Sequence, residues 1–565
     1  MNTILLALGT GILYLIAYQT YGKFLAKRIF KLNSDTPTPA VEQEDGVDFV
    51  PTQPEILFGH HYTSIAGAGP IVGPALAIIW GWVPALLWII FGSILMGAVH
   101  DFGALVVSLR NQGKTIGEVA ADLISPRVRI MFLSIISLAL LIVIAIFCLV
   151  IASLFSLYPE SVIPIWIEIP IAIWLGRVIY KKKKHALTYS LFALAMLYIA
   201  VIIGAYYPIV MPSIELAGVT LNPTVSWTII LLIYAYIAST MPVWCLLQPR
   251  DYINGHELFV ALGLLTLGVI FSNPTMVAPA YNPTPEGAPS MVPFLFIILA
   301  CGAVSGFHSL VGSGTTSKQL ANEKHALSIG YGSMLLEGML ATFAVIAVGA
   351  GIGLMEKNGL TGADLWNHQY ASWGAAKGLG AKVGHFVEGS AAMLGSLGIP
   401  SNIALTIMGV FVVSFACTTL DSATRLQRYA LSELSGGLKI QFLTGRHPAT
   451  ILAVFSGGLL ALHDGVGKGG LILWPLFGAT NQLLACLALL VITVYLARVG
   501  QSLLYTLIPF CFMFLVTGWS MYENMKGYAS KGDYMLLAMG GVIVSLEIWM
   551  VIEASLALKK NRAIN

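Results

Sequence analysis

The hexapeptide SIAGAG, at Ser64–Gly69, is matched by SLVGSG at Ser309–Gly314. Each has a hydroxyl residue, two apolar residues and a Gly-x-Gly triplet, and a histidine precedes each closely, His61 in the first case and His308 in the second. Both lie inside long apolar segments, where glycines permit the backbone to leave a helix. The pair of hexapeptides therefore predicts two interrupted membrane helices, and the fold expected for the chain depends on this prediction.

The composition excludes a soluble fold. Of the 565 residues, 57% are hydrophobic and 10% are charged, and the mean hydropathy is +0.82. Apolar runs of about 20 residues, the length that crosses a bilayer, recur from end to end. They are continuously apolar and do not alternate with polar residues, which excludes a membrane β-barrel. The sequence thus predicts an all-α polytopic membrane protein.

The apolar runs predict about fifteen spans. They are 3–20, 61–80, 82–109, 130–157, 161–177, 187–209, 226–247, 257–277, 291–316, 327–352, 402–420, 449–464, 470–497, 501–519 and 534–557. Basic residues crowd alternate loops, for example at Lys23–Lys31 and Arg177–Lys184, whereas most of the opposite loops have almost none. By the positive-inside rule we expect the N-terminus outside and the C-terminus in the cytoplasm.

Six parts of the chain follow from this pattern. They are an N-terminal helix with its basic flank (1–32), an acidic Pro-rich cytoplasmic linker (33–57), a first repeat (58–210), two accessory helices (211–290), a second repeat (291–500) and C-terminal accessory helices (501–565). The stretch 384–400 favours an amphipathic or partly re-entrant helix. The six cysteines occur singly, without a CxxC motif, and we expect them to be unpaired.

A second pair of segments strengthens the repeat. FGSILMG (Phe91–Gly97) lies in the span after the first hexapeptide, and YGSMLLEG (Tyr331–Gly338) lies in the span after the second. The predicted spans place the two sets in opposite membrane orientations. Similar segments in the same order and opposite orientation are typical of inverted-repeat secondary transporters, whose site lies at mid-membrane between broken helices. The spans leave five-plus-five and seven-plus-seven repeats open.

Interrupted helices free backbone amides and carbonyls, and these attract anions and cations respectively. Pro70 and Pro74 hinder the helix from resuming directly. The alternative is that the glycines are small-residue packing faces. On the site interpretation, the predicted substrate-binding residues are His60, His61, Ser64, Gly67, Gly69, His308, Ser309, Gly312 and Gly314.

An ionisable residue inside a membrane span costs free energy, so such residues mark candidate coupling sites. Asp101 and Glu337 are such residues, and the sequence leaves two roles open for them. One is proton coupling or gating, and the other is a structural pairing with a basic residue or the backbone. Asp421 precedes Arg425 by four residues, a helical ion-pair spacing, so we expect a structural pair there. The coupling ion is expected to be H⁺ or Na⁺.

A sodium site is one interpretation of Thr418, Thr419 and Ser422, whose hydroxyls in a five-plus-five transporter would meet carbonyls of the first broken helix. Hydroxyls bonded to their own helix are the alternative. The histidines His60, His61 and His308 offer hydrogen bonds to cargo or backbone, with a proton-coupled or a transition-metal site as alternatives. Polar residues that line a pathway or lock helices together are Gln248, Arg250, Asn481 and Gln482.

Motifs for other classes are missing from the sequence. It contains no phosphate-binding glycine loop with Gly-Lys-Ser/Thr, no hydrolase elbow and no HExxH zinc motif. We therefore expect neither an enzyme nor a self-contained ATP-driven pump, and no cofactor. Transport would be driven by an ion gradient or be passive.

Six segments together resemble the carbon-starvation protein A family. They are LFGHHYTSIAGAGPIVGPALA (Leu57–Ala77), GAVHDFGALVVSLRNQGKTIGEVA (Gly97–Ala120), PVWCLLQPRDYIN (Pro242–Asn254), HSLVGSGTTSKQL (His308–Leu320), LDSATRLQRYALSE (Leu420–Glu433) and WPLFGATNQLLA (Trp474–Ala485). The resemblance implies inner-membrane peptide uptake induced on carbon starvation, or proton-coupled pyruvate transport as in some members. It also implies the leucine-transporter-type fold of the amino acid–polyamine–cation superfamily. The chain is shorter than long enterobacterial members, chiefly on the C-terminal side.

The predicted function is therefore a secondary active transporter in the inner membrane, importing short peptides or pyruvate with protons or sodium. Its expected partners are the small-molecule substrate and membrane lipid, and no nucleic acid. A nutrient sensor with a cytoplasmic partner and a passive channel are the alternatives. The sequence leaves the oligomeric state open.

Overall fold

The computed structural model describes residues 2–216, 219–463 and 473–562. Within these residues, 13 helices are long and apolar enough to cross a membrane. The other two predicted spans correspond to the broken segment at 291–314 and to the shorter apolar helix α21 (Arg446–Leu462). The prediction of an all-α polytopic membrane protein is confirmed. The span predicted from 470 begins outside the described residues.

The first half of the chain contains twelve α-helices, of which the first is prolonged to Ile29 by wider π turns. They are α1 (Thr3–Ala17), α2 (Pro39–Glu42), α3 (Pro54–Ala66), α4 (Gly69–Ala77), α5 (Trp82–Gly92), α6 (Ala98–Arg110), α7 (Ile116–Leu123), α8 (Pro126–Leu157), α9 (Val162–Gly176), α10 (Ala186–Tyr206), α11 (Pro223–Thr240) and α12 (Leu247–Ser272). One short antiparallel hairpin joins α10 to α11, formed by β1 (Ile214–Leu216) and β2 (Val219–Leu221).

The second half follows with α13 (Met291–Ile298), α14 (Ala300–Ala303), α15 (Gly306–Gly314), α16 (Ser333–Gly349), α17 (Gly362–Gln369), α18 (Trp373–Ala376), α19 (Leu379–Gly395), α20 (Ser401–Gly437), α21, α23 (Trp474–Arg498), α24 (Leu504–Lys531) and α25 (Tyr534–Arg562). A second hairpin, β3 (Glu356–Lys357) with β4 (Leu360–Thr361), precedes α17. Short 3₁₀ and π turns connect α15 to α16, at Thr316–Lys318 and Leu327–Gly332.

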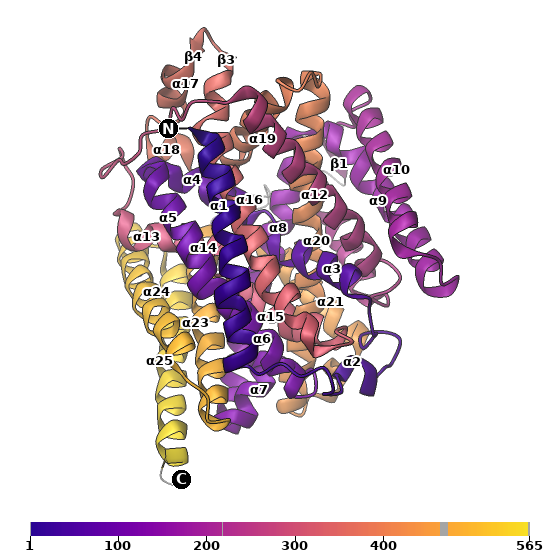
Figure 1. Cartoon of the computed structure of the whole chain (residues 1–565), viewed down its shortest axis with the longest axis vertical. Helices are drawn as coiled ribbons and strands as arrows, with labels where there is room; N and C mark the ends of the chain where they lie inside the picture. Colours follow the sequence, from indigo (N-terminus) through magenta and orange to yellow (C-terminus); the bar gives the residue numbers. More distant parts are fainter. Residues whose placement is uncertain (1, 217–218, 464–472, 563–565) are drawn as a thin grey trace.

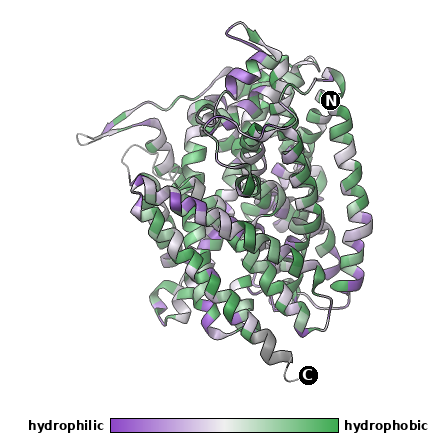
Figure 2. Ribbon diagram, turned by 90° about the vertical axis from the view of Figure 1, so that its left-hand side faces the viewer, coloured by the Kyte–Doolittle hydropathy of each residue, from purple (hydrophilic) through white to green (hydrophobic). Residues whose placement is uncertain are grey.

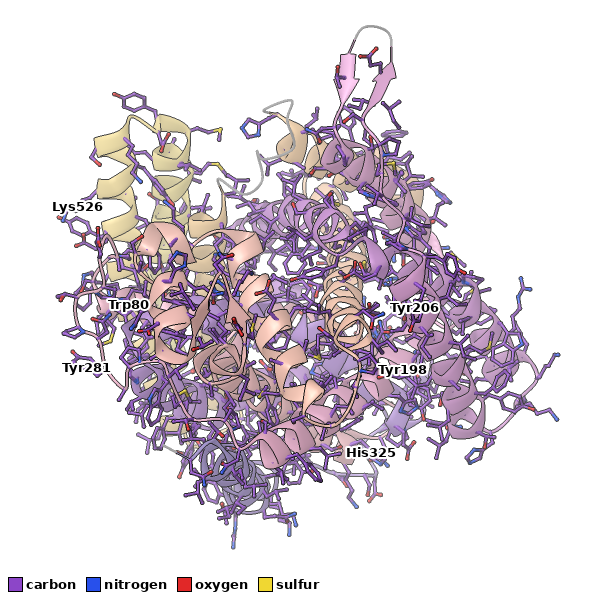
Figure 3. The ribbon with its side chains drawn as sticks, turned by 90° about the horizontal axis from the view of Figure 1, so that it is seen from above. Trp80, Tyr198, Tyr206, Tyr281, His325 and Lys526 are labelled. Carbon is purple, nitrogen blue, oxygen red and sulfur yellow. The ribbon has the colours of Figure 1, made fainter. Side chains whose placement is uncertain are left out.

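The helices form one bundle in which α3, α8, α15 and α20 are central (Figure 1). Two helix pairs lie on opposite edges, α9 with α10 and α24 with α25. Viewed from above, Tyr206 of α10 and Lys526 of α24 mark these two sides (Figure 3). On the side that Figure 2 shows, apolar residues recur along the helices, as a lipid-facing surface requires. The helix α1 begins at one end of the bundle, and α25 ends at the other (Figure 1).

The acidic segment before α3 packs onto one end of the bundle, which we call the linker end. The amide of Val50 donates to the carbonyl of Lys318 (3.2 Å), and the amide of Thr52 donates to the carbonyl of Gln319 (3.0 Å). Pro54 begins α3, where a proline fits the first helical turn. The linker is thus an ordered segment, and its last residues continue directly into α3, the first half of the first broken helix.

The stretch before α20 and the cysteines were also the subject of predictions. The stretch 384–400 largely lies in α19, a helix of 17 residues outside the 13 candidate spans. The six cysteines are free, as expected. The division into repeats and accessory helices stays a prediction. It assigned 211–290 to accessory helices, yet α12 packs closely against α3, since Gly59 and Gly255 meet backbone to backbone at their crossing.

Candidate functional site

The first hexapeptide breaks its helix as predicted. The helix α3 ends at Ala66, Gly67 takes a positive φ of 45°, and α4 begins at Gly69. A Cβ atom on Gly67 would lie 2.6 Å from Thr419 Oγ1, so both the backbone angle and the close approach of α20 require glycine here. Pro70 in the first turn of α4 starts the new helix without needing its own N–H.

The second hexapeptide lies within α15, which ends at Gly314, so the prediction that Gly312 and Gly314 interrupt a helix is wrong. Their role in substrate binding stays a prediction. Both lie within α15, and the chain leaves helical geometry earlier, at Leu299 and at Val304. The two glycines serve packing instead, which was the alternative. A Cβ on Gly314 would collide with Leu426 of α20, and one on Gly312 would touch α6. A glycine inside a helix costs only about 1 kcal/mol, and close helix packing offsets that loss.

Asn481 of α23 holds the start of α15. Its Oδ1 accepts a 2.9 Å hydrogen bond from the amide of Phe307, and Ser305 Oγ lies 3.0 Å from its Nδ2. Amides in the first turn of a helix have no partner within that helix, so this side chain satisfies one of them. Gln482 donates to the carbonyl of Phe296 in α13. Both residues therefore lock helices together, one of the two roles left open by the sequence.

The two broken segments pack directly on each other. A Cβ on Gly69 would collide with Cys301, and one on Gly73 would collide with the carbonyl of Ile298. Ser93 donates to the carbonyl of Gly302, also in the second break. A transporter site between facing broken helices has this arrangement. The prediction that the two interrupted segments face each other is confirmed, with the second interruption displaced towards the N-terminus.

A buried cluster of two acids and two histidines lies beside the second break. His308 Nδ1 is 2.9 Å from Asp101 Oδ2, and His100 Nδ1 is 2.7 Å from Asp101 Oδ1. On its other side, His308 Nε2 lies 3.3 Å from Glu337 Oε2. All four side chains are buried and come from three helices, α6, α15 and α16. The structure thus brings Asp101, His308 and Glu337 together.

His308 Nε2 and both carboxyl oxygens of Glu337 have no hydrogen-bond partner among the described residues, although the two side chains are in contact. A carboxylate at Asp101 accepts from both rings, which places a hydrogen on Nδ1 of His308. If the imidazole is neutral, its Nε2 is an acceptor that faces the acceptor oxygens of Glu337. The contact is favourable only when a proton sits on His308 Nε2 or on Glu337. The role of this pair in proton coupling stays a prediction.

A second buried cluster surrounds Arg250 of α12. Its guanidinium bonds Asp421 at 2.7 Å, and its Nε lies 3.4 Å from Glu168 of α9. The expected pair of Asp421 with Arg425 is wrong. Arg425 turns instead towards the linker, where it bonds Asp48 at 2.9 Å. Asp421 and Arg425 thus each pair with a residue outside α20 and not with each other.

The predicted sodium ligands separate in the structure. Thr419 lies against Gly67 at the first break, while Ser422 Oγ lies 3.0 Å from Ser64 Oγ. Thr418 accepts a 3.1 Å hydrogen bond from Nδ2 of Asn254. Two of the three hydroxyls therefore face α12 and α3 side chains, an arrangement that the sequence analysis did not include.

The three histidines near the breaks have separate partners. His60 Nδ1 bonds Asp251, His61 Nδ1 lies 2.8 Å from Thr316 Oγ1, and His308 belongs to the Asp101 cluster. Within the described part of the chain, no group of three or more His, Cys, Asp or Glu residues is arranged to hold a metal ion. The transition-metal alternative has no support from this geometry. Ser309 is bonded to the carbonyl of Gly306 in its own helix.

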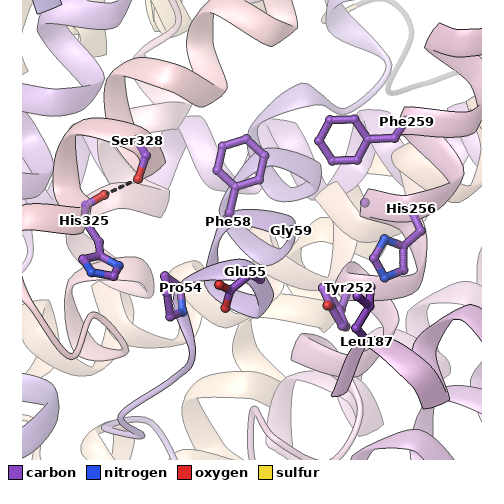
Figure 4. A pocket seen from close by; sticks show the side chains of 11 residues that line it. Pro54, Glu55, Phe58, Gly59, Leu187, Tyr252, His256, Phe259, His325 and Ser328 are labelled. Carbon is purple, nitrogen blue, oxygen red and sulfur yellow. Dashed lines mark hydrogen bonds between the residues drawn. The ribbon is translucent and has the colours of Figure 1, made fainter. Parts of the chain in front are cut away.

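A pocket of about 510 Å³ opens near the linker end, between the start of α3, α12 and the turns before α16 (Figure 4). The rings of Phe58 and Phe259 stack at 6.3 Å on one side. Glu55, His256 and His325 supply its polar groups. Gly59, Tyr252 and Gly255, where α3 crosses α12, form the inner wall. Their sequence neighbours, His60 after Gly59 and Asp251 before Tyr252, are fully buried.

Five buried acids were missed by the sequence analysis: Glu168, Asp251, Glu257, Glu323 and Glu547. Glu168 and Glu547 stand within predicted spans and Glu257 opens one, so a count of every charged residue at or near a span would have found them. Asp251 stood in the quoted LLQPRDYING segment, but it was not separated from the residues around it. The linker residue Asp48 offered no signal, because an acidic residue in a polar segment is ordinary.

Comparisons with known proteins agree on one family. The model of the family described as carbon starvation protein CstA matches residues 2–520. A peptide transporter CstA of Campylobacter jejuni is 33% identical, and the match covers 94% of this chain and 81% of that protein. The peptide transporter CstA of Bacillus subtilis is 31% identical, with 93% and 91% covered. The pyruvate/proton symporter BtsT of Escherichia coli is 31% identical, with 90% and 80% covered.

Among solved structures, a manganese transporter of Eremococcus coleocola superposes with a TM-score of 0.51. The match covers 91% of this chain and 99% of that one, at 11% sequence identity. At this identity the likeness concerns the fold alone, and it agrees with a helical membrane transporter.

Proposed function

Because this chain belongs to the carbon starvation protein CstA family, we propose that it is a proton-coupled secondary transporter that imports small carboxylate-bearing nutrients. It is a multi-pass membrane protein and not an enzyme. The sensor and channel alternatives gain no support from the relatives, which are named as transporters.

The proposed substrates are short peptides or pyruvate. Relatives of similar identity are named for each, so the names leave both substrates open. Peptides and pyruvate share a carboxylate. We propose that this group approaches the first turn of α4, next to Gly67, where helix-start amides and the helix dipole favour an anion. Nε2 of His61, in α3 ahead of this break, has no partner among the described residues and would hydrogen-bond the cargo.

The observation that supports proton coupling is the contact between His308 and Glu337. The pair is fully buried, a proton shared by its two side chains would make their contact favourable, and His308 lies in α15, the helix that begins just after the second break. A change in the packing of α15 against α16 would alter how tightly this proton is held. Substrate-linked movement of the broken helices and proton uptake would thus be coupled through one contact.

We further propose an inner-membrane location, with the linker end facing the cytoplasm and the N-terminus outside. Basic residues at Lys23–Lys31 and Arg177–Lys184 lie on the corresponding loops and support this orientation. Labelling of single cysteines introduced at Asn2 and at Ser34 with a membrane-impermeant reagent in intact cells tests it. Labelling of the second but not the first would overturn the proposed orientation.

Transport is tested with purified protein in proteoliposomes. We expect saturable accumulation of labelled pyruvate or of a labelled dipeptide when the outside is made acidic, and collapse of accumulation by a protonophore. Counterflow without a gradient identifies the substrate independently of coupling. A flux that never exceeds equilibrium indicates a channel, and the absence of uptake and counterflow for both substrates overturns the proposed substrate class.

A further inference from the structure

We propose that Lys382 of α19 forms a docking site for the carboxylate of a small organic anion, which meets this lysine before it reaches the first break. The helix α19 lies at the end of the bundle opposite the linker end (Figure 1). The inference rests on the proposed function in one respect, since it takes the docked anion to be the transported nutrient. Docking itself is measurable without transport.

Among the described residues, the ammonium of Lys382 is buried without a counter-charge. The residue is 5% exposed, and its ammonium lies 4.9 Å from the centre of the Trp474 ring, at the start of α23. In this part of the chain it has neither a carboxylate nor a hydrogen-bond acceptor as partner. Glu388, an acid on the same helix, pairs with Lys357 instead. A buried charge without an opposite charge costs free energy, and an aromatic face offsets only part of that cost.

The position of Lys382 in its helix adds a second unfavourable feature. The residue stands at the first turn of α19, which begins at Leu379 and contains no acidic residue there. The N-cap of this helix, Gly378, has no side chain that could accept from the free amides. A lysine at this end is unfavourable, because the helix dipole is positive at the N-terminus. A bound anion would relieve both the missing counter-charge and the conflict with the dipole.

The lysine also keeps its charge at neutral pH. Burial lowers the pKa of Lys382 from the usual 10.5 to about 8, so the ammonium form still predominates at pH 7. The site is therefore a cation at the pH at which carboxylates are ionised.

A row of aromatic rings connects Lys382 to the first break. The ring of Trp474 lies 5.9 Å from that of Phe477 in the next turn of α23. The ring of Phe477 lies 6.3 Å from that of Phe147 in α8. Phe147 in turn lies 3.7 Å from the place of a Cβ atom on Gly67. The ammonium without a counter-charge and the break proposed to receive the cargo carboxylate are thus the two ends of one row of side chains.

This row indicates what kind of anion the lysine receives. Because the rings lie between the ammonium and the break, Lys382 is a first contact and not a ligand at α4. The faces of Trp474 and Phe477 offer an apolar surface to the organic part of a carboxylate, whereas an inorganic anion would gain from the charge alone. One ammonium holds a carboxylate as a point charge, without the two parallel hydrogen bonds of an arginine, which suits capture followed by release.

Docking is tested without transport, through the fluorescence of Trp474. Purified full-length protein is titrated at constant ionic strength with pyruvate, with the dipeptide Ala-Ala, with chloride, and with ethyl pyruvate, which has no free carboxylate. A carboxylate that draws the ammonium away from the indole should change its emission. We expect a saturable change with pyruvate or Ala-Ala and none with ethyl pyruvate. Trp474→Phe should lose the change, although the chain has 12 tryptophans.

Lys382→Met removes the charge and keeps an unbranched apolar side chain. It should raise the midpoint of the titration, and the KM for uptake into proteoliposomes, about tenfold or more, with little change in the maximal rate. Lys382→Arg should restore both values. Since the ammonium has no counter-charge among the described residues, Lys382→Met should have the wild-type Tm or a higher one, whereas a structural lysine predicts a lower Tm. Lys377→Met, at a nearby exposed lysine, is the matched control and should keep the wild-type affinity.

An unchanged midpoint and KM in Lys382→Met would overturn the docking site. A failure of this variant to fold, or a lower Tm that Lys382→Arg does not restore, would show a structural lysine and overturn it as well. A response to chloride equal to that of pyruvate would overturn the assignment to organic carboxylates. Uptake with a wild-type KM in Lys382→Met refutes the docking site alone. A change in emission that depends on Lys382, without uptake of either nutrient, refutes the proposed function alone.

Discussion

Asp48 on the linker accepts a 2.9 Å hydrogen bond from Arg425 of α20, 377 residues later in the chain. Arg428, one turn further along α20, lies 3.3 Å from the same carboxylate oxygen. The linker runs without interruption into α3, so this contact ties the first broken helix to the helix that faces its break. We call this contact of Asp48 with Arg425 and Arg428, which holds the linker against the linker end of the bundle, the latch.

Asp48→Asn should loosen this latch. The arginines hold the pKa of Asp48 at about 2, below its usual 3.8, although burial alone raises it. The difference corresponds to on the order of 2 kcal/mol of linker docking. We expect cleavage of the linker by proteinase K to become about tenfold faster or more. Asp35→Asn, at an exposed linker position where the described residues provide no arginine partner, is the control.

The same shift predicts how the latch depends on pH. Because the folded pKa is lower than the unfolded one, the stabilisation is complete above pH 4 and is lost as pH falls towards 2. Linker cleavage in the wild type should therefore be equal at pH 5, 6.5 and 8, after correction for protease activity. A steep increase between pH 8 and 5 would show that another group controls the latch.

Gly67→Ala should destabilise the protein by about 1–3 kcal/mol, because the new Cβ meets Thr419 Oγ1 and the positive φ strains any side chain. Thermal unfolding measures the effect. The double variant with Thr419→Ala should lose less than the sum of the two changes, since it removes the collision but not the strain. Gly11→Ala, in α1 with no atom within 4 Å of the new Cβ, is the control and should be neutral or slightly stabilising. Additive losses in the double variant would contradict the proposed collision.

Glu337→Gln should uncouple transport from the proton gradient. A glutamine donates permanently to His308 Nε2 and removes the need for a proton between the two side chains. We expect counterflow to continue, while accumulation driven by an acidic exterior falls by tenfold or more. Glu523→Gln, at a partly exposed position of α24 next to Lys526, should leave both unchanged. Persistence of full gradient-driven accumulation in Glu337→Gln would assign the coupling proton elsewhere.

We expect His385 of α19, at the end of the bundle opposite the linker end, to make the stability of the fold depend on pH. Its Nδ1 lies 3.1 Å from the hydroxyl of Tyr370, which donates to the carbonyl of Ala75 in α4. Burial, with a smaller effect of Lys357, lowers the pKa of His385 to about 4. Since the unfolded form takes up a proton below pH 6.5, stability should fall between pH 6.5 and 4 and be constant above.

At pH 5 the loss is on the order of 1–2 kcal/mol. His385→Asn should remove this part of the pH dependence, seen as a smaller difference in Tm between pH 7.5 and pH 5. His447→Asn, at an exposed histidine bonded to Tyr236, is the control and should keep the wild-type difference. An unchanged difference in His385→Asn would contradict the assignment.

The candidate site was only partly predictable. Asp101 and Glu337 could be found because a charge in an apolar run is conspicuous, yet their common partner His308 depends on how α6, α15 and α16 pack. Asp421 and Arg425 had the correct helical spacing for a pair, but tertiary contacts supplied Arg250 and Asp48 instead. The second break was misplaced for a related reason. Gly312 and Gly314 suit both a break and a close packing face, and only the neighbouring Leu426 distinguishes the two.

The sequence by itself determined that this is a bundle of membrane helices, where they lie, and that Gly67 interrupts one of them. Hydrophobicity, proline and glycine act locally, so these features can be read along the chain. Only the tertiary structure decided which buried acid meets which base, where the second helix breaks, and that Lys382 lies over the ring of Trp474. Such pairings depend on residues hundreds of positions apart, and the low polarity around them makes each partner matter more than any local preference.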